Sequence, residues 1–149
     1  MEIQRFNLSA RLDYTPQSMD RFVDLCEQAI LAITDNHQAR FLLKTAVDEL
    51  TLNAIEHGYG KVSGQITVAL EHCGDVIRFE ISDFGRGIDP SKIRFDRIAR
   101  TEDDLKSRGW AFSILDKLSE GVDIAPNDPH GARIVLLVPL YDKPLPEDP

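Results

Sequence analysis

Hydrophobic residues recur along the chain with two different periods, and each period predicts a kind of element. Residues 6–12 alternate between apolar and polar side chains, which predicts a half-buried first strand. Apolar residues then follow the helical period from Met19 to Ile33 and predict a first helix with one face in the core. Thr15 followed by Pro16 is typical of a helix start, because Thr caps a helix and Pro suits its first position.

A second helix is expected between two turn signals. Asp35 or Asn36 can cap its start, and Gly58 can end it, because glycine adopts a left-handed backbone at no steric cost. One side of this helix is apolar at helical spacing and predicts a face packed in the core; its residues are Leu43, Val47, Leu50 and Ala54.

The polar side of the same helix carries Glu49, Asn53 and His57, which lie four residues apart and therefore share a face. A carboxylate, a carboxamide and an imidazole in one row can supply a base, a metal ligand and a hydrogen-bond partner. Asn53 in particular offers an oxygen to a hard cation such as Mg²⁺. Taken alone, the row is equally typical of the solvated face of a surface helix, so its meaning depends on the motifs that follow.

Two further strands flank a tight turn. Residues 65–71 and 77–82 alternate in polarity, and Gly74-Asp75 lies between them, so the pattern predicts an antiparallel hairpin. Residues 88–108, by contrast, are rich in charged side chains. A loop this long in a compact domain is usually functional or mobile, and we expect it to act as a lid.

The remaining chain predicts one helix and a closing pair of strands. The helix is expected from Gly109 to Gly121, and the strands at 122–124 and 134–140 flank a turn. Long helices combined with a mostly antiparallel sheet predict an α+β fold of the two-layer sandwich type. We expect one domain over residues 1–142 and a flexible tail over 143–149.

Composition narrows the classes of function. The chain has 149 residues with a formal net charge of -8, which argues against a nucleic-acid surface but leaves room for a small basic pocket. Its two cysteines have no CxxC spacing, so neither a disulfide framework nor a zinc site is indicated. No apolar run reaches membrane-spanning length, and the N-terminus has no signal-peptide pattern, so we expect a cytoplasmic protein with no membrane partner.

Two more motifs have the chemistry of a ligand site. Asp83 ends a predicted strand and is followed by Gly85 and Gly87, which allow a close approach of the backbone to a ligand. Arg108 and Gly109 open a predicted helix, whose free amides and partial positive charge favour phosphate. Each motif alone is also compatible with an ordinary turn or loop end.

In this order, the motifs resemble the GHKL ATP-binding superfamily of gyrase, histidine kinases and MutL. Within it, the chain is most similar to the anti-sigma-factor serine/threonine-protein kinases of bacterial partner-switching pathways. This resemblance implies a Bergerat fold, with a mixed, mostly antiparallel sheet under helices, ATP between the two layers and a mobile lid. The residues that carry it are Glu49-x-x-x-Asn53-Ala54-Ile55-x-His57-Gly58-Tyr59, Asp83-x-Gly85-x-Gly87 and Arg108-Gly109.

The resemblance also implies a role for each motif residue. Glu49 is the general base that takes a proton from a substrate serine, Asn53 is the ligand of the Mg²⁺ bound with ATP, and Asp83 accepts the adenine amino group. The other nucleotide-binding residues are Gly85 and Gly87 in the adenine pocket, Arg108 and Gly109 at the phosphates, and His57, which belongs to the motif without an assigned role.

The chain departs from the family pattern at three positions. Ser107 stands where the third motif usually begins with glycine, and Trp110 stands where it continues with leucine. Ala132 follows Gly131 where the last strand usually has threonine, so a hydroxyl is lost. These changes affect the expected phosphate affinity and turnover more than adenine binding.

The resemblance implies an ATP-dependent serine kinase that phosphorylates a STAS-domain anti-anti-sigma protein. It also implies that the protein holds a sigma factor or similar output protein and forms a homodimer. A second interpretation is a nucleotide-responsive binding module that sequesters partners without phosphate transfer. The third is an α+β domain that binds no nucleotide.

Overall fold

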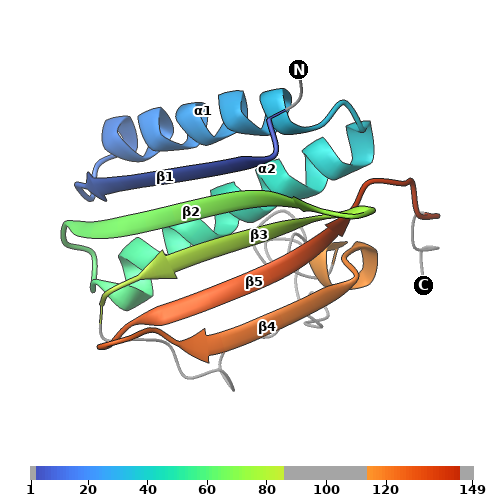
Figure 1. Ribbon diagram of the computed structural model, residues 1–149. Helices are drawn as coiled ribbons and strands as arrows, with labels where there is room; N and C mark the ends of the chain where they lie inside the picture. Colours follow the sequence, from blue (N-terminus) through green and yellow to red (C-terminus); the bar gives the residue numbers. More distant parts are fainter. Residues whose placement is uncertain (1–2, 86–113, 145–149) are drawn as a thin grey trace, which may run out of the picture.

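The chain folds as one antiparallel sheet with helices packed on one of its faces (Figure 1). The computed structural model describes residues 3–85 and 114–144. The arrangement confirms the predicted two-layer α+β fold. In chain order the elements are β1 (Arg5–Leu12), α1 (Pro16–Ile33), α2 (His37–Asn53), the π-helical turn η1 (Ala54–Gly58), β2 (Gly64–Cys73), β3 (Val76–Asp83), β4 (Gly121–Pro126) and β5 (Ala132–Pro139), and residues 114–118 are also helical.

Neighbouring strands follow the order β1-β2-β3-β5-β4, and each described pair is antiparallel. The predicted sheet was mixed but mostly antiparallel, whereas the described strands contain no parallel pair. The connections explain this difference. After β1, the helix α1 runs back along the sheet and α2 runs forward again, so that β2 enters opposite to β1 (Figure 1). The pairs β2–β3 and β4–β5 are hairpins, which are antiparallel by construction, and β3 also pairs with β5 in the antiparallel direction.

Both predicted helix starts are confirmed by their caps. The side chain of Thr15 accepts a hydrogen bond from the Ser18 amide at 3.1 Å, and Pro16 occupies the first position of α1. Asn36, one of the two residues predicted to cap α2, accepts from the Ala39 amide at 2.8 Å. These caps fix where α2 begins, and therefore which of its residues face the sheet.

The core lies between the helices and the covered face of the sheet. All four residues of the predicted apolar stripe on α2 are buried. β5 lies between β3 and β4, and its buried residues alternate with the exposed Arg133 and the half-buried Val135 and Leu137. The largest fully buried side chains are Phe22, Ile30, Ile33, Leu42, Leu43, Leu50, Ile55, Ile66, Leu70, Ile77, Phe79 and Leu115.

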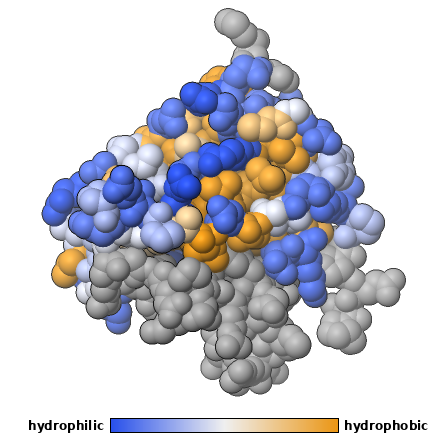
Figure 2. Space-filling model, turned by 60° about the horizontal axis from the view of Figure 1, so that its bottom comes forward, coloured by the Kyte–Doolittle hydropathy of each residue, from blue (hydrophilic) through white to orange (hydrophobic). Residues whose placement is uncertain are grey.

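The face of the sheet without a described helix is polar in part. Arg78 forms an ion pair with Glu80 at 2.6 Å, and Arg133 on β5 approaches the same carboxylate at 3.8 Å. Figure 2 shows apolar residues gathered between hydrophilic ones on the side of the molecule that comes forward when the bottom of Figure 1 is turned up. On that side, apolar side chains therefore form part of the surface of the described residues.

The chain after β5 returns to the start of α2. The Lys143 amide donates to Gln38 Oε1 at 2.6 Å, and Gln38 Nε2 donates to the Lys143 carbonyl at 2.9 Å. Asn36 Nδ2 also donates to Asp142 Oδ1 at 3.1 Å. The contacts of the fold thus reach Lys143, one residue beyond the predicted boundary, and residues 145–149 of the predicted tail lie outside the described residues.

The two cysteines are free and differ in environment. Cys26 is buried in α1, and burial raises the pKa of its thiol to about 12. Cys73 is exposed at the end of β2, beside the turn to β3. In the described part of the chain, no helix combines the length and the apolar composition needed to cross a membrane.

Candidate functional site

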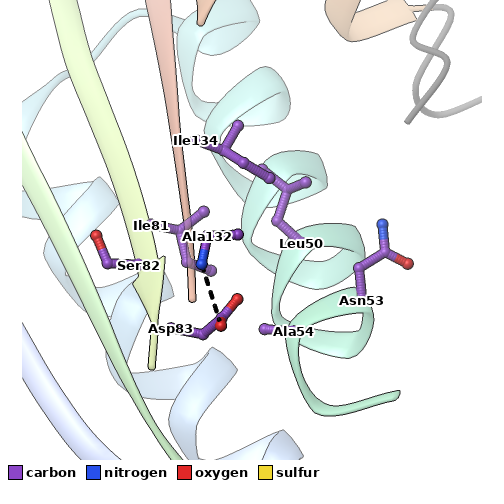
Figure 3. A pocket seen from close by; sticks show the side chains of 8 residues that line it. All are labelled: Leu50, Asn53, Ala54, Ile81, Ser82, Asp83, Ala132 and Ile134. Carbon is purple, nitrogen blue, oxygen red and sulfur yellow. Dashed lines mark hydrogen bonds between the residues drawn. The ribbon is translucent and has the colours of Figure 1, made fainter. Parts of the chain in front are cut away.

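A narrow cavity lies where α2 passes the ends of β3 and β5 (Figure 3). Its walls are mostly apolar, and one carboxylate stands at its end. The space enclosed is about 10 Å³, which suits about one water molecule. The described residues therefore form only a narrow part of any larger ligand site. The lining residues are Leu50, Asn53, Ala54, Ile81, Ser82, Asp83, Ala132 and Ile134.

Asp83 supplies the carboxylate and is only 4% exposed. Its Oδ1 accepts hydrogen bonds from the amides of Gly85 at 3.0 Å and Ala132 at 3.3 Å. Desolvation by burial raises the pKa of Asp83, and these two amides and the nearby His130 offset only part of that rise. The second carboxylate oxygen points toward the side of the cavity formed by α2 (Figure 3). Asp83 can therefore accept one more hydrogen bond from a ligand with an amino group.

The turn between β4 and β5 holds the backbone beside Asp83. Asn127 Nδ2 donates to the Asp83 carbonyl at 2.8 Å, and His130 Nδ1 lies 3.0 Å from the Gly85 carbonyl. Gly131 has φ 110°, and a Cβ there would lie 2.0 Å from the Asp83 carbonyl oxygen. Sequence reasoning treated residues 127–131 only as a turn and missed these contacts.

Tyr59 holds the same backbone from the other side. Its hydroxyl accepts from the Phe84 amide at 2.7 Å and donates to the Gln65 carbonyl at 2.5 Å. Burial raises the pKa of Tyr59, so the hydroxyl keeps its proton at neutral pH. Sequence reasoning quoted Tyr59 as part of a motif without giving it a role, and the only local signal was its place between Gly58 and Gly60.

The helix α2 carries two other predicted site residues, of which Asn53 lines the cavity. Glu49 and Asn53 lie one turn apart on α2, and both are half-buried. One carboxylate oxygen of Glu49, Oε2, is buried. The Asn53 carboxamide points away from Asp83 (Figure 3), so the two residues mark opposite ends of the site.

The α-helical part of the predicted second helix ends at Asn53. Residues Ala54–Gly58 form a π-helical turn, in which the Tyr59 amide donates to the Ala54 carbonyl five residues back at 3.0 Å. His57 lies within this turn, and its side chain is outside the described part of the structure. The left-handed backbone predicted at Gly58 occurs at Gly60 instead, where φ is 64°.

Several predicted residues fall outside the described part of the chain. These include Gly87 of the adenine motif, Arg108 and Gly109 of the phosphate motif, and the predicted lid over residues 88–108. The neighbouring departures Ser107 and Trp110 fall there as well. Gly85 is described and half-buried, and its amide binds the Asp83 carboxylate.

The cavity encloses only about one water molecule, but the groups that line it have the chemistry to contact an adenine nucleotide bound with Mg²⁺. The apolar walls suit a flat base, and the buried carboxylate suits its amino group. Within the described ranges, no group of three or more His, Cys, Asp or Glu side chains is placed to hold a metal ion. Asn53 offers a side-chain oxygen, which is the kind of ligand that Mg²⁺ takes once or twice from a protein while phosphates and water complete its shell.

Comparison with known proteins points in the same direction. Residues 38–142 match the family described as "Histidine kinase-, DNA gyrase B-, and HSP90-like ATPase". An "Anti-sigma F factor" of Clostridium botulinum (strain Eklund 17B / Type B) is 30% identical over 93 residues, which are 62% of this chain and 65% of that protein. The chain thus spans slightly less than two thirds of that relative. An "Anti-sigma F factor" of Clostridium novyi (strain NT) is 23% identical over 137 residues, or 91% of each chain.

A solved structure has the same fold. It is the crystal structure of the RsbU and RsbW domains of Rv1364c from Mycobacterium tuberculosis, with a TM-score of 0.58 and 22% identity. The match covers 90% of this chain and 32% of that one. The similarity supports the Bergerat-type arrangement of helices over an antiparallel sheet.

Burial of Asp83 leads to a prediction for stability against pH. Because its folded-state pKa is raised, the native state binds the proton more tightly than the unfolded state does. The contribution of Asp83 to the free energy of unfolding is therefore fully present below its unfolded-state pKa of about 3.9. That contribution is lost as the pH rises through its folded-state pKa. Asp83→Asn keeps an acceptor without the charge. We therefore expect its free energy of unfolding at pH 7 to equal or exceed that of the wild type, with the difference shrinking toward pH 4.

Urea unfolding of both proteins between pH 4 and pH 7 measures this difference. Asp123→Asn, at an exposed position of β4, controls for removing a carboxylate and should show no such trend. A variant that is less stable than the wild type at pH 7, by a margin that grows with pH, contradicts the prediction.

Gly131 should tolerate no side chain. Gly131→Ala adds a Cβ at φ 110° and 2.0 Å from a carbonyl oxygen. We expect a loss of about 1–3 kcal/mol from overpacking in addition to about 1–2 kcal/mol for the left-handed backbone. Gly74→Ala is the matched control, because Gly74 has φ 68° with nothing within 4 Å of the added Cβ. Equal losses in urea unfolding of the two variants would show that the contact with Asp83 is unimportant.

Proposed function

The chain belongs to the family of histidine kinase-, DNA gyrase B- and HSP90-like ATPases, and we propose that it is an ATP-dependent protein-serine kinase that also acts as an anti-sigma factor. One observation carries the proposal. The buried carboxylate of Asp83 stands at one end of a cavity whose helical wall includes Asn53, and Glu49 lies one turn before Asn53 on the same face of α2. In this proposal, Asp83 on the sheet binds the adenine, while Asn53 binds the metal and Glu49 serves as the general base on the facing helix α2.

ATP binds with its adenine at Asp83 in this proposal. The adenine amino group donates to the carboxylate oxygen that points toward α2, while the other oxygen stays bound to the amides of Gly85 and Ala132. Leu50, Ala54 and Ile81 supply apolar contacts to the ring. Gly87 is proposed to shape the same pocket.

The phosphates extend toward the end of the site marked by Asn53. The Asn53 oxygen is the proposed Mg²⁺ ligand, and the ion neutralises charge on the phosphate oxygens when it is bound. Arg108 and Gly109 are proposed to bind the phosphates through a charge-assisted hydrogen bond and a free amide. His57 belongs to the same motif, and we assign it no separate role.

Glu49 acts as the general base. Its carboxylate takes the proton of the substrate serine while the serine oxygen bonds to the γ-phosphorus of ATP. The bond between that phosphorus and the leaving oxygen of ADP breaks in the same step. Because Glu49 is half-buried on the same helical face as Asn53, it can act next to the phosphate whose metal Asn53 binds.

The named relatives support the choice of partners. Because two of them are anti-sigma F factors, we propose that the chain binds a sigma factor or similar output protein. The phosphorylated partner is a STAS-domain anti-anti-sigma protein, and the protein works in the cytoplasm as a homodimer. The acidic balance of the chain gives no support to a nucleic-acid partner.

A nucleotide-responsive binding module is the alternative. Ala132 lines the cavity and offers no hydroxyl to a ligand or water there, which favours a site with weak turnover. In this alternative, ATP changes the affinity for partners, and no phosphate is transferred.

Magnesium dependence should be lost in Asn53→Ala. If the Asn53 oxygen is a metal ligand, the variant should lose most of the gain in ATP affinity that Mg²⁺ provides, and binding without Mg²⁺ should change little. Calorimetry with and without Mg²⁺ measures both. Asn7→Ala, at an exposed position of β1, is the control. Equal losses with and without the metal would assign Asn53 a structural role instead.

Glu49→Gln distinguishes the kinase from the binding module. The variant keeps the shape and hydrogen bonding of the side chain but removes the base. Transfer of labelled phosphate from ATP to a STAS-domain protein encoded nearby should fall by at least about a hundredfold. ATP affinity and partner binding should remain nearly unchanged. Glu71→Gln on β2, whose side chain pairs with Arg5, should transfer phosphate at the wild-type rate.

Two other outcomes decide against parts of this proposal. Equal inactivity of the wild type and Glu49→Gln, together with an equal response to ATP in a pull-down with the partner, favours the binding module. Equal activity of both shows that the protein is a kinase with a different base.

A further inference from the structure

We propose that Tyr59 is a positioning residue of the nucleotide site, and that its hydroxyl holds the adenine-binding turn after β3 against the end of α2. This inference rests on the proposed adenine site at Asp83. Tyr59 does not line the cavity, and it contributes to the selectivity for adenine by holding the backbone next to Asp83.

The argument begins with one peptide group. The Asp83 carbonyl and the Phe84 amide belong to the same planar unit. The carbonyl accepts from Asn127 Nδ2 at 2.8 Å, and the amide donates to the Tyr59 hydroxyl at 2.7 Å. The unit is therefore held at both ends by side chains from two different parts of the chain. Since the unit is rigid, fixing both ends restricts the backbone rotation that orients the Asp83 side chain.

Tyr59 also connects the two walls of the cavity. It directly follows the turn Ala54–Gly58, and its amide donates to the Ala54 carbonyl at 3.0 Å. Ala54 lines the helical wall, while Asp83 ends the wall formed by the sheet. The hydroxyl bond to Phe84 thus joins the end of α2 to the turn that carries the carboxylate.

The position of the ring depends on Gly64. A Cβ at residue 64 would lie 2.4 Å from three ring carbons of Tyr59. The next residue, Gln65, accepts the hydroxyl proton through its carbonyl at 2.5 Å. The start of β2 therefore supplies both the space for the ring and the acceptor for its proton. The same hydroxyl can then accept from Phe84 in a fixed direction.

Loss of the Tyr59 hydroxyl should weaken the binding of the adenine and leave the binding of the phosphates unchanged. In Tyr59→Phe the ring remains, but the Phe84 amide loses its acceptor and the peptide group is held only through Asn127. The Asp83 carboxylate then samples more orientations. The hydroxyl bonds to the Phe84 amide and the Gln65 carbonyl, whereas Asn53 lines the other end of the cavity. The expected signature is weaker binding of adenine nucleotides with unchanged binding of magnesium tripolyphosphate, which has phosphates but no base.

Calorimetry on the full chain tests this signature with ATP, GTP and tripolyphosphate, each with Mg²⁺. For Tyr59→Phe we expect the ATP affinity to fall by about fivefold to a hundredfold, the effect of leaving one partly buried polar group unpaired. The preference for ATP over GTP should fall by a similar factor, and tripolyphosphate affinity should stay within about twofold. Tyr141→Phe is the matched control, because it removes a hydroxyl bonded to Glu120 on another part of the surface.

A second variant tests the same geometry with the hydroxyl present. Gly64→Ala should displace the ring and give the same loss of adenine affinity with unchanged tripolyphosphate affinity. In the Asp83→Ala background, which has no acceptor for the adenine amino group, Tyr59→Phe should change ATP affinity by less than about twofold, because its effect passes through the Asp83 side chain. Thermal unfolding followed by circular dichroism shows whether each variant is folded.

The outcomes separate this inference from the proposed function. If the wild type binds ATP and Asp83→Ala does not weaken it, the adenine site fails, and the role of Tyr59 fails with it. If Asp83→Ala weakens ATP binding but Tyr59→Phe does not, only the role of Tyr59 is overturned. Equal losses for ATP and tripolyphosphate, or an undiminished effect of Tyr59→Phe in the Asp83→Ala background, also overturn it and leave Tyr59 as a general structural residue.

Discussion

Burial of a carboxylate is the constraint on which the site depends. A buried ionised group is costly unless hydrogen bonds replace its water, and Asp83 receives them from the amides of Gly85 and Ala132. Both donors are backbone groups, so their positions depend on how β3, β5 and the turn after β3 are packed. The arrangement restricts the sequence as well, since only glycine fits at residue 131 beside the Asp83 carbonyl. The sheet and its connecting turns therefore fix the carboxylate before any ligand binds.

Local signals in the sequence predicted most of the fold. The caps at Thr15 and Asn36 and the turn at Gly74 involve residues close in sequence, so their patterns are readable without the structure. The contacts of Tyr59 and Asn127 with the segment after β3 were not predictable in this way. They join segments 25 and 44 residues apart. The π-helical turn was missed because its composition does not differ from that of an α-helical end.

The departure at Ala132 leaves the hydrogen bond between residue 132 and Asp83 in place. The bond from residue 132 to Asp83 comes from the backbone amide, so replacing the usual threonine by alanine leaves this bond in place. What is lost is one hydroxyl at the wall of the cavity. The geometry around the proposed adenine contact is therefore intact, and any effect of the departure falls on water or ligand atoms that the hydroxyl would have bound.

The contrast between the two cysteines has a practical consequence. Cys26 is buried and its thiol stays protonated, whereas Cys73 is exposed beside the turn that leads into β3. β3 runs for eight residues from that turn to Asp83, a length of about 25 Å at roughly 3.3 Å per residue. A maleimide dye will therefore attach at one place without mutagenesis. That distance is well suited to energy transfer to a fluorescent nucleotide analogue, so occupancy of the pocket can be followed in the unmodified sequence.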